Sequence, residues 1–133
     1  MRKVCAALAL AAMGSCVLVA AEPEKYEMTT YQVALIVKGP NWTPAETEET
    51  KAIQAGHMDN IRKMAATGKL LIAGPLGDGG DLRGMFIFRV ATVEDAKALA
   101  EQDPAFKAGR LKYEWHPWFA AKNVTVTATA PKP

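Results

Sequence analysis

Two helix-start signatures, each placed between apolar segments, constrain the fold of this chain more than any other feature. In TPAE, Thr43 is expected to be an N-cap, with Pro44 at the first helical position and Glu46 closing a capping box. In TVED, Thr92 and Asp95 repeat the same pattern. Two capped helices separated by apolar, strand-like segments indicate an α+β fold.

The first of these helices is expected to be long and amphipathic. It should run to about Thr67 and end where Gly68 adopts a left-handed conformation. Apolar residues and one histidine recur at intervals of four and define its buried face. The members of this stripe are Ile53, His57, Ile61 and Ala65, with Met64 beside them. His57 therefore lies in the middle of an otherwise apolar face.

Four segments read as β-strands that are apolar on both faces. They are YQVALIVKG, KLLIAGPLG, RGMFIFRV and the last strand at residues 110–119, and DGGD joins the second to the third. In the third strand, Phe86 and Phe88 point to one face while Met85 and Ile87 point to the other. The order β, α, β, β, α, β predicts a ferredoxin-like fold with a four-stranded antiparallel sheet.

Two helices can cover only one face of such a sheet. The second face is also apolar, and a large exposed apolar face marks a contact surface. The sheet of a second, identical chain, related by a two-fold axis, can cover this face without any further element. The sequence therefore predicts a homodimer whose sheets pack face to face.

The N-terminal residues have the pattern of an export signal. Arg2 and Lys3 precede an apolar, alanine-rich stretch that ends in small residues, so residues 1–21 are interpreted as a cleaved signal peptide and the protein as periplasmic or secreted. A retained anchor and a lipoprotein modified at Cys16 are the less favoured alternatives, and no stable membrane insertion is expected after cleavage. The remaining chain divides into a lead-in at 22–29, the domain at 30–120 and a flexible tail at 121–133.

Cysteine usage and charge exclude several classes of function. Both cysteines, Cys5 and Cys16, lie in the signal segment, so the mature domain has no disulfide, no cysteine nucleophile and no thiolate metal site. Without Arg2 and Lys3, the 16 basic residues become 14 and balance the 14 acidic ones. A formally neutral domain gives no indication of nucleic-acid binding.

Four stretches together resemble the YCII-related domain proteins, small members of the dimeric α+β barrel superfamily, over about residues 31–119. They are the segment around His57, LLIAGPL with GDGGDLRG, VEDAKALAEQDPAFKAG, and WHPW. The superfamily also holds muconolactone isomerases and cofactor-free monooxygenases, and one YCII branch is linked to dechlorination of chlorinated hydroxyquinols. The resemblance implies no cofactor, an acid/base dyad of His57 and Asp103 between helix and sheet, and Asp78 as a second candidate.

Each member of the dyad also has a purely structural interpretation. His57 could be a core histidine that bonds backbone or water. Asp103 precedes Pro104, and an aspartate in that position starts turns by accepting hydrogen bonds from backbone amides just ahead. Turn formation does not explain why the carboxylate lies at the edge of the gap that His57 faces, so an orienting role remains the alternative.

Other candidate residues are weaker. Trp42 and Tyr113 could line a pocket for a flat organic ligand, whereas His116 is expected at a rim or dimer contact. No metal is expected, because neither HxH nor HxxxH occurs. The sequence thus predicts an exported, cofactor-independent acid/base enzyme acting on a small molecule. The alternative is a non-catalytic small-molecule-binding or structural dimer of the same fold.

Overall fold

The structure is a computed structural model that describes residues 27–122. The described elements are β1 (Met28–Lys38), α1 (Glu48–Ala66), β2 (Leu70–Pro75), β3 (Leu82–Phe88), α2 (Val93–Ala100), α3 (Pro104–Lys107) and β4 (Leu111–Ala121). The predicted signal peptide and nearly all of the predicted tail lie outside the described residues. Within the described part, no helix is long and apolar enough to span a membrane.

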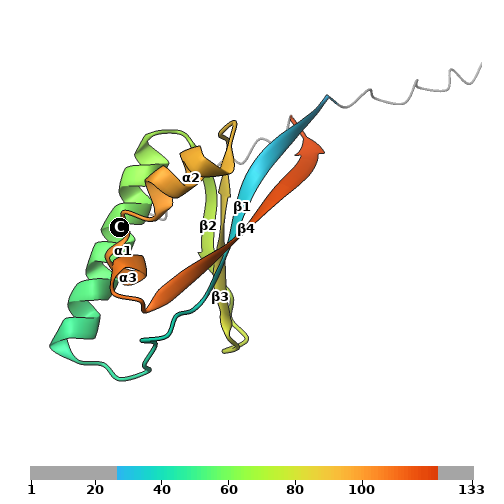
Figure 1. The fold of residues 1–133 in the computed structure, drawn as a ribbon. Helices are drawn as coiled ribbons and strands as arrows, with labels where there is room; N and C mark the ends of the chain where they lie inside the picture. Colours follow the sequence, from blue (N-terminus) through green and yellow to red (C-terminus); the bar gives the residue numbers. More distant parts are fainter. Residues whose placement is uncertain (1–26, 123–133) are drawn as a thin grey trace, which may run out of the picture.

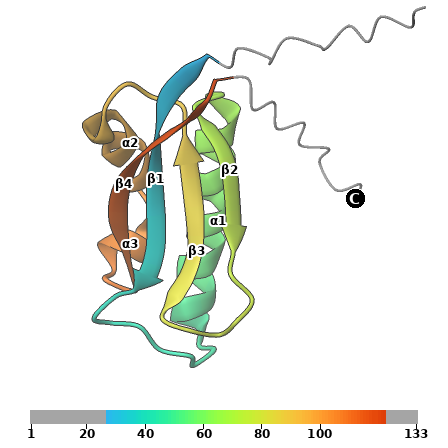
Figure 2. The same ribbon diagram turned by 90° about the vertical axis from the view of Figure 1, so that its right-hand side faces the viewer.

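The four strands form one antiparallel sheet in the order β2-β3-β1-β4. Figure 2 shows this sheet face-on, with the helices behind it, and Figure 1 shows the same arrangement from the side. One face of the sheet is therefore covered by helices and the other is open. This topology confirms the predicted ferredoxin-like α+β fold.

The two longest strands, β1 and β4, extend further than predicted. β1 and β4 pair continuously from Met28 opposite Ala121 to Lys38 opposite Leu111, and in Figure 1 they run beyond the other two strands. The Tyr31 hydroxyl donates to the carbonyl of Ala121 at 3.1 Å and holds this extension together. β1 begins two residues before the expected start of the domain at residue 30, and β4 ends one residue after its expected end at residue 120.

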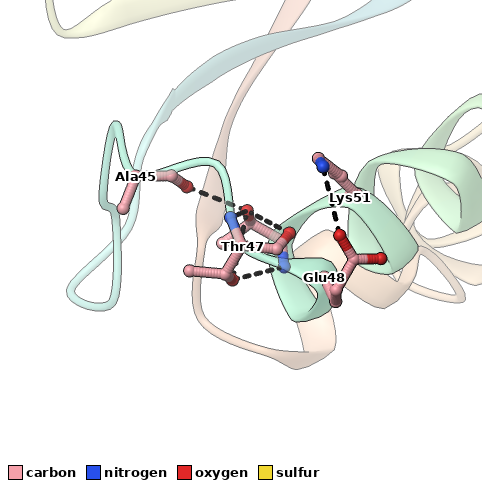
Figure 3. Close-up of polar contacts among 5 residues, drawn as sticks. Ala45, Thr47, Glu48 and Lys51 are labelled. Atoms are coloured by element: carbon pink, nitrogen blue, oxygen red, sulfur yellow. Dashed lines mark hydrogen bonds and ion pairs between the residues drawn. The ribbon is translucent and has the colours of Figure 1, made fainter.

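The start of α1 was predicted wrongly. The N-cap is Thr47, and its side chain and that of Thr50 form the reciprocal capping box (Figure 3). Thr43 instead accepts a hydrogen bond from the amide of Ala45 at 3.1 Å within the preceding loop. A threonine N-cap at Thr47 places Glu48 and Glu49 in the first turn, where carboxylates interact favourably with the helix dipole.

The buried face of α1 matches the prediction except at its C-terminal end. Met64 and Asn60 are buried, whereas Ala65 is exposed. A row of residues four apart drifts by about 40° per step around a helix with 3.6 residues per turn, so its last member has rotated to solvent. The predicted end is confirmed: Gly68 has φ +70° and its amide donates to the carbonyl of Ala65.

The second predicted helix is confirmed as α2, and a short helix that was not predicted, α3, follows it. The capping box of Thr92 and Asp95 is confirmed, but α2 ends at Ala100. Asp103 then caps a separate short helix, α3, with Pro104 at its first position. The proline cannot continue a preceding helix, yet its fixed φ suits the start of a new one.

Apolar side chains form two clusters, one on each face of the sheet. The cluster under the helices contains Phe86, Phe88 and Tyr113. The cluster on the open face contains Tyr31, Val33 and Ile87. The predicted alternation in β1 and β3 is confirmed, because residues that alternate along a strand fall into opposite clusters.

Candidate active site

His57 and Asp103 meet in the layer between α1 and α3. Their ring nitrogen Nδ1 and carboxylate oxygen Oδ2 are hydrogen-bonded, although the residues are 46 positions apart in the sequence. The Asp103 side chain is fully buried, and 12% of the His57 side chain is exposed. The structure therefore brings together the two residues of the expected dyad and leaves only the histidine accessible.

Asp103 combines both of its interpretations in one carboxylate. Its Oδ1 accepts the amide of Ala105 at 2.8 Å, which caps α3. Its Oδ2 accepts from His57 and also from the hydroxyl of Tyr113 at 2.7 Å. The same residue thus makes the turn with one oxygen and orients the histidine with the other.

These contacts shift the pKa values of Asp103 and Tyr113. Burial by itself raises the pKa of Asp103, but the hydrogen bonds of His57 and Tyr113, with the charge of His57 and the Ala105 amide, lower it further than burial raises it. The net pKa of the carboxyl lies below its ordinary value, so Asp103 is ionised at neutral pH. Burial and the nearby Asp103 charge raise the pKa of Tyr113, which keeps its proton and acts as a donor.

A cavity of about 270 Å³ opens beside His57, between α1 and the β2–β3 side of the sheet. Ligand pockets commonly occupy roughly 300–1,000 Å³, so this cavity lies just below that range and suits a molecule smaller than a typical drug. Its wall is mostly apolar, and its lining includes Ile36, Trp42, His57, Ile61, Arg83 and Phe86. The domain's own aromatic side chains do not fill it.

The remaining predicted binding residues divide three ways. Trp42 lines the cavity. Tyr113 lies behind the dyad, where its ring stacks on Phe106 with the centroids 5.1 Å apart, and it does not line the cavity. Asp78 is exposed in the β2–β3 turn and accepts a hydrogen bond from the amide of Gly80 at 3.1 Å, away from the cavity wall.

His116 lies outside the site. It is exposed on β4 opposite Val33, on the open face of the sheet. Among residues 27–122, no group of three or more His, Cys, Asp or Glu side chains is arranged to hold a metal ion.

Arg83 is a cavity residue that the sequence interpretation missed, and Arg110 lies on the same tryptophan outside the cavity wall. Their guanidinium carbons lie 5.0 Å and 4.6 Å from the centroid of the Trp42 ring. Strand alternation places Arg83 on the same face as Met85, away from the helices, so the pattern alone assigns it to the wrong side. The reason is a break in the pairing of β1 with β3 at Arg83.

Similarity to known proteins extends over nearly the whole domain. The sequence profile of the YCII-related domain matches residues 30–118. Among solved structures, a 5-chloro-2-hydroxyhydroquinone dehydrochlorinase from Burkholderia phenoliruptrix AC1100, in complex with 2,5-dihydroxybenzoquinone, is 22% identical; the match covers 68% of this chain and 93% of that one, with a TM-score of 0.46. The search of curated proteins finds no significant match. Because the profile spans most of the chain, the protein belongs to the YCII-related domain family.

Proposed function

We propose that this protein is an acid/base enzyme in which His57 exchanges a proton with a small organic molecule bound in the adjacent cavity, without a cofactor. One observation carries the proposal: a histidine on the wall of an apolar cavity is hydrogen-bonded through Nδ1 to a buried carboxylate. A buried ionised group beside an accessible titratable one is typical of catalytic sites.

The hydrogen bond between His57 and Asp103 supports the following route for the proton. The ionised Asp103 accepts a hydrogen bond from Nδ1–H of His57 and thereby selects the tautomer in which Nε2 is unprotonated. Nε2 then takes a proton from the bound molecule, and the negative charge of Asp103 stabilises the imidazolium that forms. The same nitrogen returns the proton to another atom of the molecule, so the enzyme is unchanged after one cycle.

The surrounding contacts keep Asp103 in this role. The amide of Ala105 donates to Oδ1 of the carboxylate, and the hydroxyl of Tyr113 shares Oδ2 with His57. A carboxylate that accepts several hydrogen bonds stays ionised and cannot rotate freely. Tyr113 is therefore a positioning residue, since it acts through Asp103.

A non-catalytic protein that binds a small molecule in the same cavity is the second candidate. The largely apolar lining favours it, because such a wall binds a ligand without any need for proton transfer. The two candidates differ in whether His57 is required for chemistry or only shapes the wall.

Solvent-deuterium incorporation distinguishes these candidates. The purified protein is incubated in D₂O with a panel of small carbon acids, and exchange of their C–H protons is followed by NMR. General acid/base catalysis typically contributes a factor of about 10²–10⁴, so His57→Gln should reduce exchange by that factor and Asp103→Asn should reduce it strongly.

His116→Gln is the matched control, because it removes the other histidine from the open face and should leave exchange unchanged. If His57→Gln exchanges as fast as the wild type, the histidine is not the base. If the wild type itself gives no exchange above the protein-free rate, the non-catalytic candidate is favoured.

We also propose that the protein is a homodimer and is exported. An exposed large apolar residue on the open face supports the first: Trp118 on β4, opposite Tyr31, is 43% exposed. The basic start at Arg2 and Lys3 and the alanine-rich stretch after it support the second. N-terminal sequencing of protein recovered from the cell envelope or medium tests export, and a start at Met1 would contradict it.

A further inference from the structure

Arg83 is the extra residue of a β-bulge. In the pairing of β1 with β3, Ile36 lies opposite Gly84 but the next residue, Val37, lies opposite Leu82. Arg83 therefore has no partner on β1. Bulges interrupt the alternation of side chains and re-aim the residue they insert, often beside an active site. Here the re-aimed side chain lines the His57 cavity instead of following Met85 to the open face.

The guanidinium of Arg83 is held in place at the mouth of the cavity. One nitrogen, Nη1, donates to the carbonyl of Gly80 at 3.2 Å, and the group lies over the ring of Trp42. Figure 2 shows the turn between β2 and β3 and the segment that precedes α1 at the same end of the sheet. A guanidinium carries five N–H donors, so the bond to Gly80 leaves capacity for a ligand.

The charge around the cavity is unbalanced. Of the described residues that line it, Arg83 is the one with a permanent charge, and none is a carboxylate. Arg110, on the same tryptophan, has a buried Nη1 without a hydrogen-bond partner in the described part of the chain. Lys38, the third cation near Trp42, is paired with Asp81 at 3.0 Å. Arg83 thus places a positive charge in the wall of the cavity, and no carboxylate in that wall balances it.

We propose that Arg83 determines specificity by binding the carboxylate of a small organic acid whose apolar body occupies the cavity beside His57. The inference rests on the proposed function, because it takes this cavity as the substrate site. A guanidinium binds a carboxylate through two parallel hydrogen bonds, which sets the direction of the molecule as well as its affinity. Arg83 anchors the acid end, and the apolar wall, which includes Ile61 and Phe86, directs the remainder toward the histidine.

Benzoate and benzamide are suitable probes, since they have the same shape and differ in charge. Binding is measured by NMR titration of the purified protein, with the His57 ring and Trp42 indole signals reporting on the cavity. Wild type should bind benzoate about tenfold more tightly than benzamide, because a hydrogen bond to a charged group is markedly stronger than a neutral one. Arg83→Gln should remove that preference and leave benzamide binding unchanged, while Arg83→Lys should retain part of it.

Arg62→Gln is the matched control, because this exposed arginine on α1 pairs only with Asp59 at 3.8 Å and lies outside the cavity wall. It removes one positive charge and should leave the preference intact. Circular dichroism establishes that each variant is folded. Equal affinities of wild type and Arg83→Gln for benzoate, no preference for benzoate in the wild type, or no binding of either probe each overturns the inference.

His57→Gln separates this inference from the proposed function. Benzoate should still bind this variant through Arg83, even though proton exchange is lost. If benzoate selectivity depends on Arg83 but His57→Gln retains exchange activity, the recognition inference stands and the catalytic proposal fails. If exchange depends on His57 but Arg83→Gln keeps full benzoate affinity, the catalytic proposal stands and the recognition inference fails.

Discussion

Nδ1 of His57 is hydrogen-bonded to Oδ2 of Asp103, the residue that caps helix α3. The contact requires α1 and α3 to lie very close together, and Gly56 allows this approach. A Cβ atom at Gly56 would lie 2.8 Å from Cγ of Pro104, closer than packed side chains tolerate. Gly56, the residue before His57, therefore sets how closely α1 can approach Pro104, the residue after Asp103.

Gly56→Ala should separate the two helices and weaken the dyad. Alanine favours an isolated helix over glycine by about 1 kcal/mol, yet we expect net destabilisation because the new methyl group overlaps the Pro104 ring. Urea denaturation measures the stability and deuterium incorporation measures the activity. Gly77→Ala, where no heavy atom lies within 4 Å of the new Cβ, is the control and should change neither. A more stable, fully active Gly56→Ala would contradict the close packing.

Tyr113→Phe should destabilise the protein by about 2 kcal/mol, since hydrogen bonds to charged groups contribute roughly 1.5–3 kcal/mol. The substitution removes the 2.7 Å hydrogen bond to Asp103 but keeps the ring stacked on Phe106. Tyr31→Phe is the matched comparison, because its hydroxyl bonds the neutral carbonyl of Ala121, and it should cost about 1 kcal/mol. Equal losses in the two variants would show that the charge of Asp103 adds nothing.

The ionisation of Asp103 should make stability fall in acid. Its folded-state pKa lies below the ordinary value of 3.8, so the folded protein binds this proton more weakly than the unfolded chain does. Its contribution is complete above the ordinary pKa and is lost as pH falls through the lower, native one. The stability difference between wild type and Asp103→Asn should therefore shrink below about pH 4.

Asp59 provides the control for this pH dependence. Its pKa is also lowered, by the hydrogen bond and charge of Lys63, but the side chain is exposed and solvent screens the interaction. Thermal denaturation from pH 2 to 7 should show Asp59→Asn following the wild type closely. If the stability of the wild type and that of Asp103→Asn change in parallel with pH, Asp103 has the same pKa in the folded and unfolded states.

Thr47→Ala and Thr43→Ala test which threonine begins α1. Loss of a threonine N-cap costs about 1 kcal/mol, so Thr47→Ala should be destabilised by that amount. Thr43 caps no helix and accepts one hydrogen bond in the loop, so Thr43→Ala should cost less. Chemical denaturation of both variants is sufficient, and the reverse order would restore the earlier start that the sequence predicts.

Trp118→Glu should convert the proposed dimer into a monomer. Trp118 packs beside Tyr31 on the open face, with the ring centroids 5.8 Å apart, and a charge buried between two sheets without a partner is strongly unfavourable. Light scattering coupled to size-exclusion chromatography measures the mass. Ala98→Glu, an exposed position on α2 on the opposite side of the sheet, should leave the mass unchanged. A monomeric wild type would refute the dimer.

The sequence by itself predicted the fold, and its resemblance to the YCII-related domain proteins named His57 and Asp103, which lie in contact in the structure. Alternation in β1 and β3, the capping box at Thr92 and the left-handed Gly68 are local signals, and local backbone chemistry decides them. TPAE and the start of YQVALIVKG were less informative about the ends of α1 and β1, because several residues near each end satisfy the same local rule. The cap at Thr47 and the extension of β1 to Met28 depend on hydrogen bonds with Thr50 and with β4.

Tertiary structure alone decided how the site is arranged. Asp103 divides its oxygens between Ala105 and the pair His57 and Tyr113, and no spacing in the sequence specifies that contact. Arg83 enters the cavity because pairing with β1 skips one residue, which reverses the side that alternation assigns to it. Periodicity reports the face on which a residue lies within one element, whereas register and close helix approach depend on residues far away in the chain.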